Sequence, residues 1–255
     1  MFMRFVHLKV TEDTFWEVRK FYEDKVIPTL QATEGCLFAS LLQPTVEMEE
    51  CVSMTIWASQ EHAEVYEASG TYDQLLDESD EAMAEGTEWR AELAGDRVSV
   101  PTPIYDPEVE GFPVEVAGGT AALEGSASRN LYLRIVAVRI DPVRFQELRQ
   151  RYDRELVPAL LETPGCRAAF LVEGIKARTR ALSVTVWDSE EDAVRYELSG
   201  RFDELVGKIS EFFSGLYQWK LSLSSSGPDR VSGSELEVTG YNIVTGRQLE
   251  SPDAD

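Results

Sequence analysis

The fold is decided by the stretch SMTIWASQEHAEVYEASG at residues 53–70, which recurs as SVTVWDSEEDAVRYELSG at residues 183–200. At its start, polar and apolar residues alternate with the period of two that is typical of a β-strand. Ser59 follows and can cap a helix over Gln60–Ala68, because its hydroxyl can accept a hydrogen bond from a free backbone N–H. Ser69-Gly70 ends that helix. The stretch predicts a strand followed directly by a helix, present twice.

The recurrence extends well beyond this stretch. Shifted by 130 positions, the sequence matches itself without a gap from about Phe2 to Arg90. Further matched pairs include Tyr22 with Tyr152, Pro28 with Pro158, Gly35-Cys36 with Gly165-Cys166, and Trp89 with Trp219. Self-similarity at a fixed offset is the mark of a duplicated structural unit. We therefore predict one module at residues 1–100 and a second at residues 130–232.

Each copy predicts the element order β-α-β-β-α-β. In the first copy the predicted elements are a strand at Met3–Val10, a helix capped by Thr11 or Asp13 and reaching Ile27, strands at Leu37–Leu42 and Cys51–Trp57, helices at Gln60–Ala68 and Tyr72–Ala84, and a strand at Glu88–Val100. The second copy repeats this order, with Asp141 as its helix cap. A sheet with helices on one face leaves its other face bare, so two such faces can bury each other. The sequence predicts an α+β chain that forms its own pseudo-dimer.

The remaining segments are a linker and a tail. Residues 101–129 are rich in Pro, Gly, Ala and Ser, which predicts a linker with at most short strand pieces, and Val114–Val116 can pair at a sheet edge. Residues 233–255 form a polar tail, in which Leu236–Val238 and Tyr241–Val244 predict a hairpin around Thr239-Gly240.

Composition excludes several classes of partner. The formal net charge of −22 argues against nucleic acid and against an anionic membrane surface, because both bind basic patches. No apolar run reaches membrane-spanning length and the start lacks the features of a secretory signal, which predicts a cytoplasmic protein. An acidic surface with few lysines is typical of proteins from salt-loving organisms. The three cysteines lack metal-site spacing and are predicted to pack as small hydrophobes.

Both copies resemble the antibiotic biosynthesis monooxygenase family. The resemblance lies in Ile27-Pro28, Glu34-Gly35-Cys36, Trp57-Ala58-Ser59-Gln60-Glu61 and Ser69-Gly70-Thr71-Tyr72, and in Val157-Pro158, Pro164-Gly165-Cys166, Trp187-Asp188-Ser189-Glu190-Glu191 and Ser199-Gly200-Arg201-Phe202. It implies two ferredoxin-like modules that form an intramolecular pseudo-dimeric α/β barrel, with further homo-oligomerisation left open. The superfamily includes quinol-forming oxygenases, haem-degrading enzymes and members without known activity, so the resemblance does not identify a reaction.

One strand face in each copy is predicted to line a ligand pocket. Its residues are Ser53, Thr55 and Trp57 in the first copy and Ser183, Thr185 and Trp187 in the second. A polar face that ends in tryptophan suits a pocket for a small aromatic molecule. The alternative is that both tryptophans fill the space under the helices. In the resembling oxygenases an Asn that binds substrate stands at the positions of Ser53 and Ser183, which weakens the transfer of activity.

Three further residue types complete the predicted site. Tyr66 and Tyr196, on the helix after this strand, can hydrogen-bond a ligand oxygen, and Tyr72 follows the glycine break. His7 is the one plausible imidazole base of the first copy, and its counterpart is Ala137. We predict His7 and Tyr66 as catalytic and Tyr72 and Tyr196 as ligand-binding, while packing remains the alternative for each.

The function predicted from these residues is binding of a small aromatic or quinol-like molecule, with direct oxygenation that requires no metal or cofactor. A second hypothesis is a non-catalytic ligand-binding or structural protein. A third is haem binding or breakdown, against which stands the lack of histidine in Tyr72–Glu85 and Phe202–Leu216.

Overall fold

A computed structural model describes residues 1–10, 14–45, 50–79, 108–118, 131–173, 180–213 and 237–248. The chain forms two compact units, one comprising Met1–Glu110 and Ile243–Asp255 and the other Gly111–Asn242. The module boundaries predicted at Val100, Arg129 and Ser232 lie outside the described residues.

The first module follows the predicted order as far as it is described. Its elements are β1 (Phe2–Lys9), α1 (Phe15–Phe21), the π-helical turn η1 (Tyr22–Val26), α2 (Ile27–Gln31), β2 (Cys36–Pro44), β3 (Glu50–Trp57) and α3 (Gln60–Ala68), with residues 71–79 also helical. The predicted caps Thr11 and Asp13 and the predicted last strand, Glu88–Val100, fall outside the described residues.

The second module repeats these elements. They are β5 (Tyr132–Arg139), η4 (Pro142–Arg144), α5 (Phe145–Arg151), η5 (Tyr152–Leu156), α6 (Val157–Leu161), β6 (Cys166–Glu173), β7 (Arg180–Trp187), α7 (Glu190–Leu198), α8 (Arg201–Ile209) and η6 (Ser210–Phe212). The predicted caps are confirmed, since the side chains of Ser59 and Asp141 accept hydrogen bonds from the backbone N–H groups of His62 and Val143. Ser189 caps α7 in the same way.

The first helix of each module contains a π-helical turn that the sequence did not predict. In both copies the turn stands directly before a short helix with proline in its first turn, Pro28 in α2 and Pro158 in α6. Proline has no N–H to donate to the preceding turn, and its ring needs space beside that turn's carbonyl. A locally widened turn accommodates both effects without ending the helical run.

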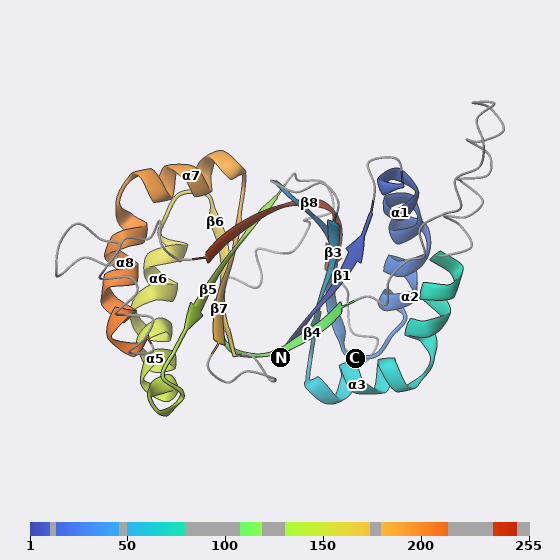
Figure 1. Cartoon of the computed structure of the whole chain (residues 1–255), viewed down its shortest axis with the longest axis horizontal. Coiled ribbons are helices and arrows are strands. Elements are labelled where there is room, and N and C mark those ends of the chain that lie inside the picture. The colour runs from blue at the N-terminus through green and yellow to red at the C-terminus, as the bar shows by residue number, and fades with distance from the viewer. Residues whose placement is uncertain are drawn as a thin grey trace, which may run out of the picture. The chain divides into compact units, whose positions relative to one another are not determined.

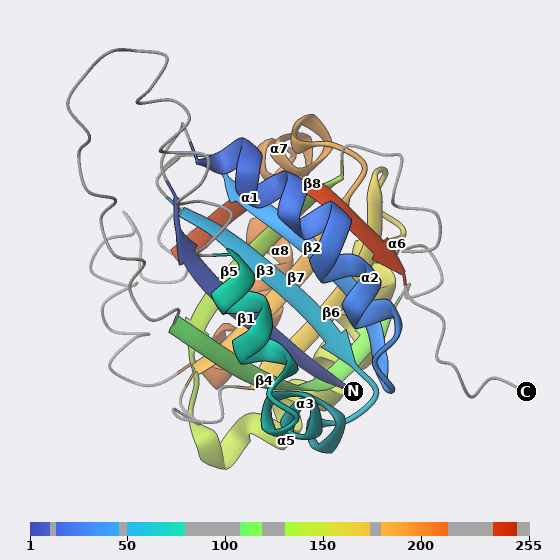
Figure 2. The same cartoon turned by 90° about the vertical axis from the view of Figure 1, so that its right-hand side faces the viewer.

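The strands of each module form an antiparallel sheet. In the first module β3 lies between β1 and β2, with Arg4 opposite Thr55 and Val6 opposite Ser53. In the second module β7 lies between β5 and β6 with the equivalent register, so Arg134 is opposite Thr185. The helices cover one face of each sheet (Figure 1). Figure 2 views the first module from this side and shows α1 and α2 in succession across β2 and β3.

Two additional strands extend the second module's sheet. The strand β4 (Glu108–Gly118) pairs with β6, and Val114 lies opposite Val172, which confirms the predicted sheet-edge pairing. The strand is longer than the short pieces predicted for the linker. The hairpin predicted around Thr239-Gly240 is wrong, because β8 (Glu237–Gln248) is one continuous strand along β5, with Thr239 opposite Ile135 and Gly240 opposite Arg134. Pairing with β5 satisfies the backbone groups that a hairpin would have paired locally.

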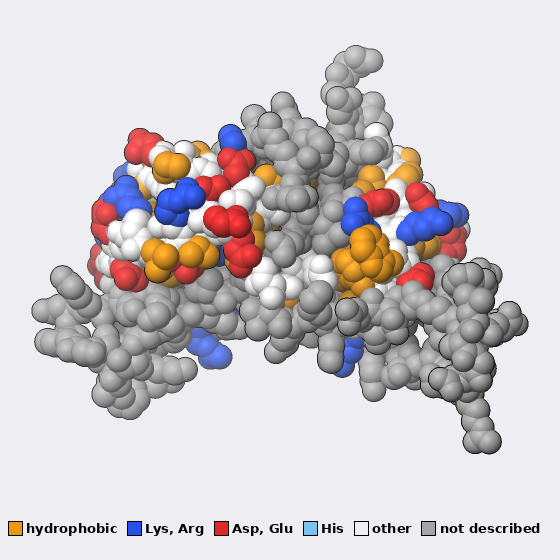
Figure 3. All heavy atoms as spheres, turned by 90° about the horizontal axis from the view of Figure 1, so that it is seen from above, with side chains coloured by type: hydrophobic (Ala, Val, Ile, Leu, Met, Phe, Trp, Pro, Cys, Tyr) orange, Lys and Arg blue, Asp and Glu red, His pale blue; other side chains and the backbone are white. Residues whose placement is uncertain are grey.

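The described surface mixes charge types. Acidic side chains are interspersed with Lys and Arg in the view of Figure 3, and several form ion pairs such as Arg201 with Glu204 and Arg151 with Glu211. Within the described ranges, no helix has the length and apolar character needed to cross a membrane.

Candidate functional site

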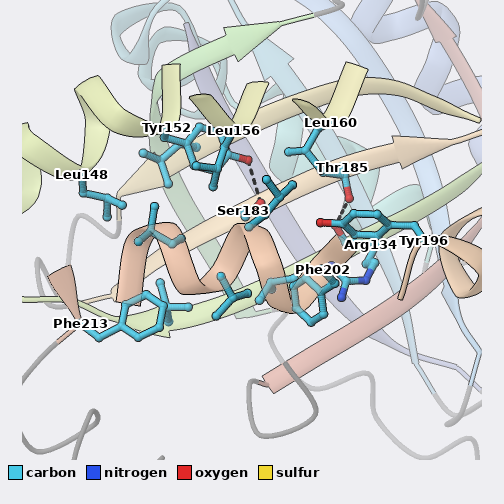
Figure 4. A pocket seen from close by; sticks show the side chains of 16 residues that line it. Arg134, Leu148, Tyr152, Leu156, Leu160, Ser183, Thr185, Tyr196, Phe202 and Phe213 are labelled. Carbon is cyan, nitrogen blue, oxygen red and sulfur yellow. Dashed lines mark hydrogen bonds between the residues drawn. The ribbon is translucent and has the colours of Figure 1, made fainter. Parts of the chain in front are cut away.

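A cavity lies between the sheet and the helices of the second module. Its volume is about 40 Å³. Strands β5 and β7 contribute polar groups from Arg134, Ser183 and Thr185, and the helical run contributes Tyr152. Most of the remaining lining is apolar and comes largely from the helices, including Leu148, Leu156, Leu160, Phe202, Leu205, Val206 and Ile209. Figure 4 shows Tyr196 and Arg134 towards one end and Phe213 and Leu148 towards the other.

The predicted strand face faces this cavity, but its hydroxyl groups already have partners. Ser183 Oγ and Tyr152 Oη are 2.8 Å apart and share a hydrogen bond. Trp187 Nε1 donates to Thr185 Oγ1 at 2.9 Å, and Thr185 Oγ1 donates to the carbonyl oxygen of Arg134 at 3.3 Å. Trp187 is fully buried. Ser183 and Thr185 therefore line the cavity as a fixed hydrogen-bonded wall.

The first module repeats two of these hydrogen bonds. Ser53 Oγ and Tyr22 Oη are 3.0 Å apart, and Trp57 Nε1 donates to Thr55 Oγ1 at 2.8 Å. Trp57 is fully buried, like Trp187. The serine–tyrosine and tryptophan–threonine hydrogen bonds are thus present at equivalent positions of both modules. In both modules these hydroxyl groups therefore hold the buried tryptophan and tyrosine side chains in place.

Aromatic rings continue from each tryptophan across the following helices. The ring centroids of Trp187 and Tyr196 are 5.0 Å apart, and those of Tyr196 and Phe202 are 5.9 Å apart. In the first module the distances are 5.1 Å from Trp57 to Tyr66 and 6.3 Å from Tyr66 to Tyr72. These separations lie in the range of favourable aromatic contacts. The structure therefore brings together the aromatic residues that the sequence predicted for the site.

A buried arginine, absent from the sequence prediction, completes the cluster. Arg134 is 3% exposed, and its Nε donates to Glu197 Oε1 at 2.7 Å. Its guanidinium carbon lies 4.1 Å from the Phe202 ring centroid and 5.8 Å from that of Tyr196, distances at which a cation is attracted to the ring face.

Arg4 occupies the equivalent position in the first module. It is 4% exposed, and its Nε donates to Glu67 Oε1 at 2.7 Å. Its guanidinium carbon lies 4.4 Å from the Tyr72 ring centroid. The signal that could have identified both arginines is their separation of 130 positions, the same as that of Glu67 and Glu197.

Burial keeps the tyrosines of both clusters neutral. It raises the pKa of Tyr22, Tyr66, Tyr152 and Tyr196, because a phenolate would lose its hydration there. Burial also raises the pKa of Tyr72, and the positive charge of Arg4 opposes this change. Each hydroxyl therefore stays protonated at neutral pH and can donate a hydrogen bond.

The predicted base, His7, is separated from the rest of the predicted site. His7 lies opposite Val52, which alternates with Ser53 along β3. Its side chain therefore points to the sheet face opposite the one that carries Ser53 and Thr55. Its Nδ1 contacts Glu50 Oε1. The structure brings Tyr66 to the aromatic cluster but does not bring His7 there.

None of the described His or Cys side chains is among those that line the cavity. His62 Nδ1 is hydrogen-bonded to Ser59 Oγ at 2.6 Å, at the start of α3. The three thiols are buried, and burial raises the pKa of each to about 12. In the part of the chain that the structure describes, no three His, Cys, Asp or Glu side chains are grouped as a metal site requires.

Comparison with known families agrees with this architecture. A family model described as antibiotic biosynthesis monooxygenase matches residues 1–77 and, separately, residues 131–208. The two matches confirm both the resemblance and the duplication. No curated protein sequence gave a significant match.

Solved structures with the same fold span nearly the whole chain. A proposed monooxygenase from Lactobacillus acidophilus aligns with a TM-score of 0.64 at 11% identity, covering 98% of this chain and 97% of its own. A proposed monooxygenase from Fusobacterium nucleatum gives 0.64 at 9% identity, covering 98% and 95%. An anthrone oxidase-like protein gives 0.54 at 17% identity, covering 100% and 96%. Identities this low show a shared fold and no more.

Proposed function

The chain belongs to the antibiotic biosynthesis monooxygenase family, and on this basis we propose that it binds a small aromatic, quinol-like molecule and oxygenates it without a metal or organic cofactor. The ligand occupies the space between sheet and helices in the second module. By the duplication, the equivalent space in the first module is a second candidate site.

One observation carries the proposal, namely the cavity whose apolar wall is interrupted by a few convergent polar groups. Aliphatic side chains and Phe202 suit an aromatic ring, and Tyr196 and Arg134 supply hydrogen-bond donors at one end. An apolar pocket with a small number of placed polar groups is the usual form of a small-molecule site. Because the Tyr196 hydroxyl is neutral, it can donate to a ligand oxygen that becomes negative during reaction.

The proposed reaction balances with dioxygen as its one oxidant. A substrate methylene beside an ionisable oxygen on the ring loses a proton to water, and the resulting anion passes one electron to O2. The two radicals combine to a peroxide, and loss of water leaves a carbonyl group. One oxygen atom enters the product, while the other leaves as water with both methylene hydrogens. The protein contributes binding, orientation and stabilisation of the anion, with the tyrosine hydroxyl as donor.

The size of the cavity sets a condition on this proposal. A cavity of about 150 Å³ can hold one benzene molecule, whereas the cavity here is about 40 Å³. The helices must therefore move outward when an aromatic ligand enters. The break between α7 and α8 at Gly200, which has a φ of 77°, is a place where α8 can pivot.

The proposal is tested by thermal unfolding at high salt in the presence of hydroxylated anthrones, quinols and haem, followed by oxygen uptake with any compound that binds. Val206→Phe fills the cavity from α8, and Val194→Phe makes the same change at a half-exposed position of α7 outside it. We expect an aromatic phenol to raise the melting temperature of the parent and of Val194→Phe but not of Val206→Phe. Equal shifts in both variants would place the ligand elsewhere.

A second candidate, a non-catalytic ligand-binding or structural protein, is favoured by the internal pairing of Ser183 with Tyr152 and of Thr185 with Trp187. These groups are satisfied without a ligand. Ligand binding without oxygen uptake would select this candidate. A haem absorption band that persists after gel filtration would instead select the haem hypothesis.

A further inference from the structure

Each module contains a guanidinium group whose hydrogen-bonding capacity is only partly used. Arg134 Nη2 lies 2.7 Å from Glu197 Oε1, yet among the described residues it makes no hydrogen bond of acceptable geometry, and the atom is buried. Arg4 Nη2 is also buried, and among the described residues no acceptor meets it with the geometry of a hydrogen bond. A buried donor left unpaired is costly. The same nitrogen lacks a well-directed hydrogen bond in both copies, although Arg134 Nη2 stays in ion-pair contact with Glu197, so both buried guanidinium groups keep donor capacity for a further oxygen.

The charge balance around each arginine leaves a positive field on the cavity side. The arginine side chains are 3% and 4% exposed, whereas the side chains of Glu197 and Glu67 are 40% and 44% exposed. Water screens the half-exposed carboxylates, but it does not screen the buried guanidinium groups to the same degree. A group inside the module therefore experiences the arginine charge more strongly than that of its carboxylate partner.

The guanidinium group of the second module also lies at the cavity. Arg134 is one of the residues that line it, and its planar group lies against the ring of Phe202 (Figure 4). An aromatic ligand that enters beside Phe202 would bring an oxygen attached to its ring within reach of the N–H groups of Arg134. Hydrogen bonds between a guanidinium and an ionised oxygen are shorter and stronger than those to a neutral oxygen.

We propose that Arg134, and Arg4 in the first module, bind an ionised oxygen of the ligand, so that these pockets select phenolates or enolates over the neutral forms. This inference rests on the proposed function, because it assumes that an aromatic molecule enters the space between sheet and helices. It adds the residue that recognises the ligand and the charge state in which the ligand binds.

The two modules differ at the residue that stacks on this arginine. Tyr72 stands where the second module has Phe202, and its hydroxyl is buried beside the Arg4 guanidinium group, with which it interacts. The first module thus has a phenol hydroxyl beside its buried arginine, and the second has a phenyl ring without a donor at that position. The first module accordingly binds the anion more tightly, and Phe202→Tyr should make the second module resemble it.

The test uses the full-length chain with 4-nitrophenol, whose phenolate absorbs visible light and which titrates near neutral pH. Nitrobenzene, which has no ionisable oxygen, is the matched control ligand. An opposite charge within hydrogen-bonding distance lowers a pKa by about 1–3 units. We expect bound 4-nitrophenol to titrate about 1 unit or more below the free compound, and nitrobenzene to bind more weakly.

Two sets of variants separate recognition from folding. The double variant Arg4→Met and Arg134→Met removes both charges, and we expect it to abolish the shift in titration and to weaken the binding of 4-nitrophenolate much more than that of nitrobenzene. The double variant Glu67→Gln and Glu197→Gln keeps both arginines but removes the competing carboxylates. We expect it to bind 4-nitrophenolate severalfold more tightly, an outcome that structural damage cannot produce.

The outcomes distinguish the two proposals. If both probes bind equally well, and the bound phenol titrates like the free one, the arginines do not recognise an anion although the pocket binds aromatic molecules. A titration shift that survives Arg→Met, or weaker phenolate binding by the Glu→Gln variant, also overturns the inference. If neither probe binds at millimolar concentration, the proposed function fails and this inference fails with it.

Discussion

The substitution Thr185→Val tests whether the polar strand face is structural or ligand-binding. Thr185 Oγ1 accepts a hydrogen bond from Trp187 Nε1 at 2.9 Å and donates to the Arg134 carbonyl at 3.3 Å. Valine retains the branched shape but has no hydroxyl. The indole N–H of Trp187, a fully buried residue, then has no acceptor.

The loss of stability expected for Thr185→Val comes from the indole N–H of Trp187, which is left without an acceptor. An unpaired buried polar group costs about 1–3 kcal/mol. Each kcal/mol lowers the melting temperature by about 4–8 °C for domains of roughly 60–100 residues and by about 2–4 °C for domains of roughly 150–250 residues. The unit Gly111–Asn242 lies between these sizes, so each kcal/mol should lower its melting temperature by about 4 °C. We therefore expect a clear fall in the melting temperature of the second module. Thr55→Val should act alike in the first module, where Trp57 Nε1 lies 2.8 Å from Thr55 Oγ1.

A double-mutant cycle isolates the hydrogen bond. Trp187→Phe removes the indole N–H, so Thr185→Val should cost about 1 kcal/mol less in that background than in the parent. The contact of Thr185 with the Arg134 carbonyl is lost in both backgrounds and cancels. The assay is thermal or urea unfolding at high salt, followed by circular dichroism.

The reasoning is refuted if the two costs agree within about 0.5 kcal/mol, which is the limit of additivity for uncoupled sites. Thr185 would then not be held by Trp187, and its hydroxyl would be available to a ligand. A coupling of the expected size identifies Thr185 as a residue that positions Trp187 beside the cavity.

Three further predictions concern backbone, pH and salt. Gly165→Ala should destabilise the fold far more than Gly200→Ala, as measured by urea unfolding. Both glycines have a positive φ, but a Cβ at Gly165 would lie 2.5 Å from Asp192 Cβ, whereas a Cβ at Gly200 would meet no atom within 4 Å. Burial raises the pKa of the three thiols from 9.0 to about 12, so their contribution to the stability of the fold is complete below about pH 9 and is lost as the pH rises through 12. Unfolding midpoints measured from pH 8 to 11 should therefore fall. A constant midpoint would contradict the burial of Cys36, Cys51 and Cys166. Because the net charge is −22, we also expect the melting temperature to rise with salt, and a fall between low and molar salt would contradict net self-repulsion.

The residues of the candidate site could be predicted where the same residue type occurs in both copies, 130 positions apart. Ser183, Thr185 and Tyr196 line the cavity, and Trp187 lies against Tyr196. Arg134 was missed because an arginine in a strand looks like an exposed residue, and its burial depends on Glu197 and Phe202, which are far along the chain. His7 was selected by chemistry alone, and the strand register places it on the other face of the sheet.

The sequence by itself determined the duplication and the order of the elements from β1 to α3 and from β5 to α7, because these are recorded in identities at one offset and in local periodicity. The short motifs that both copies share with the antibiotic biosynthesis monooxygenase family indicated the family. Only the tertiary structure decided that β8 continues along β5 instead of turning at Thr239-Gly240. It also decided which hydroxyl groups are hydrogen-bonded within the protein and that both arginines are buried beside aromatic rings. These features depend on contacts between residues distant in the chain, and the free energy of such contacts outweighs the local turn and strand preferences that a sequence displays.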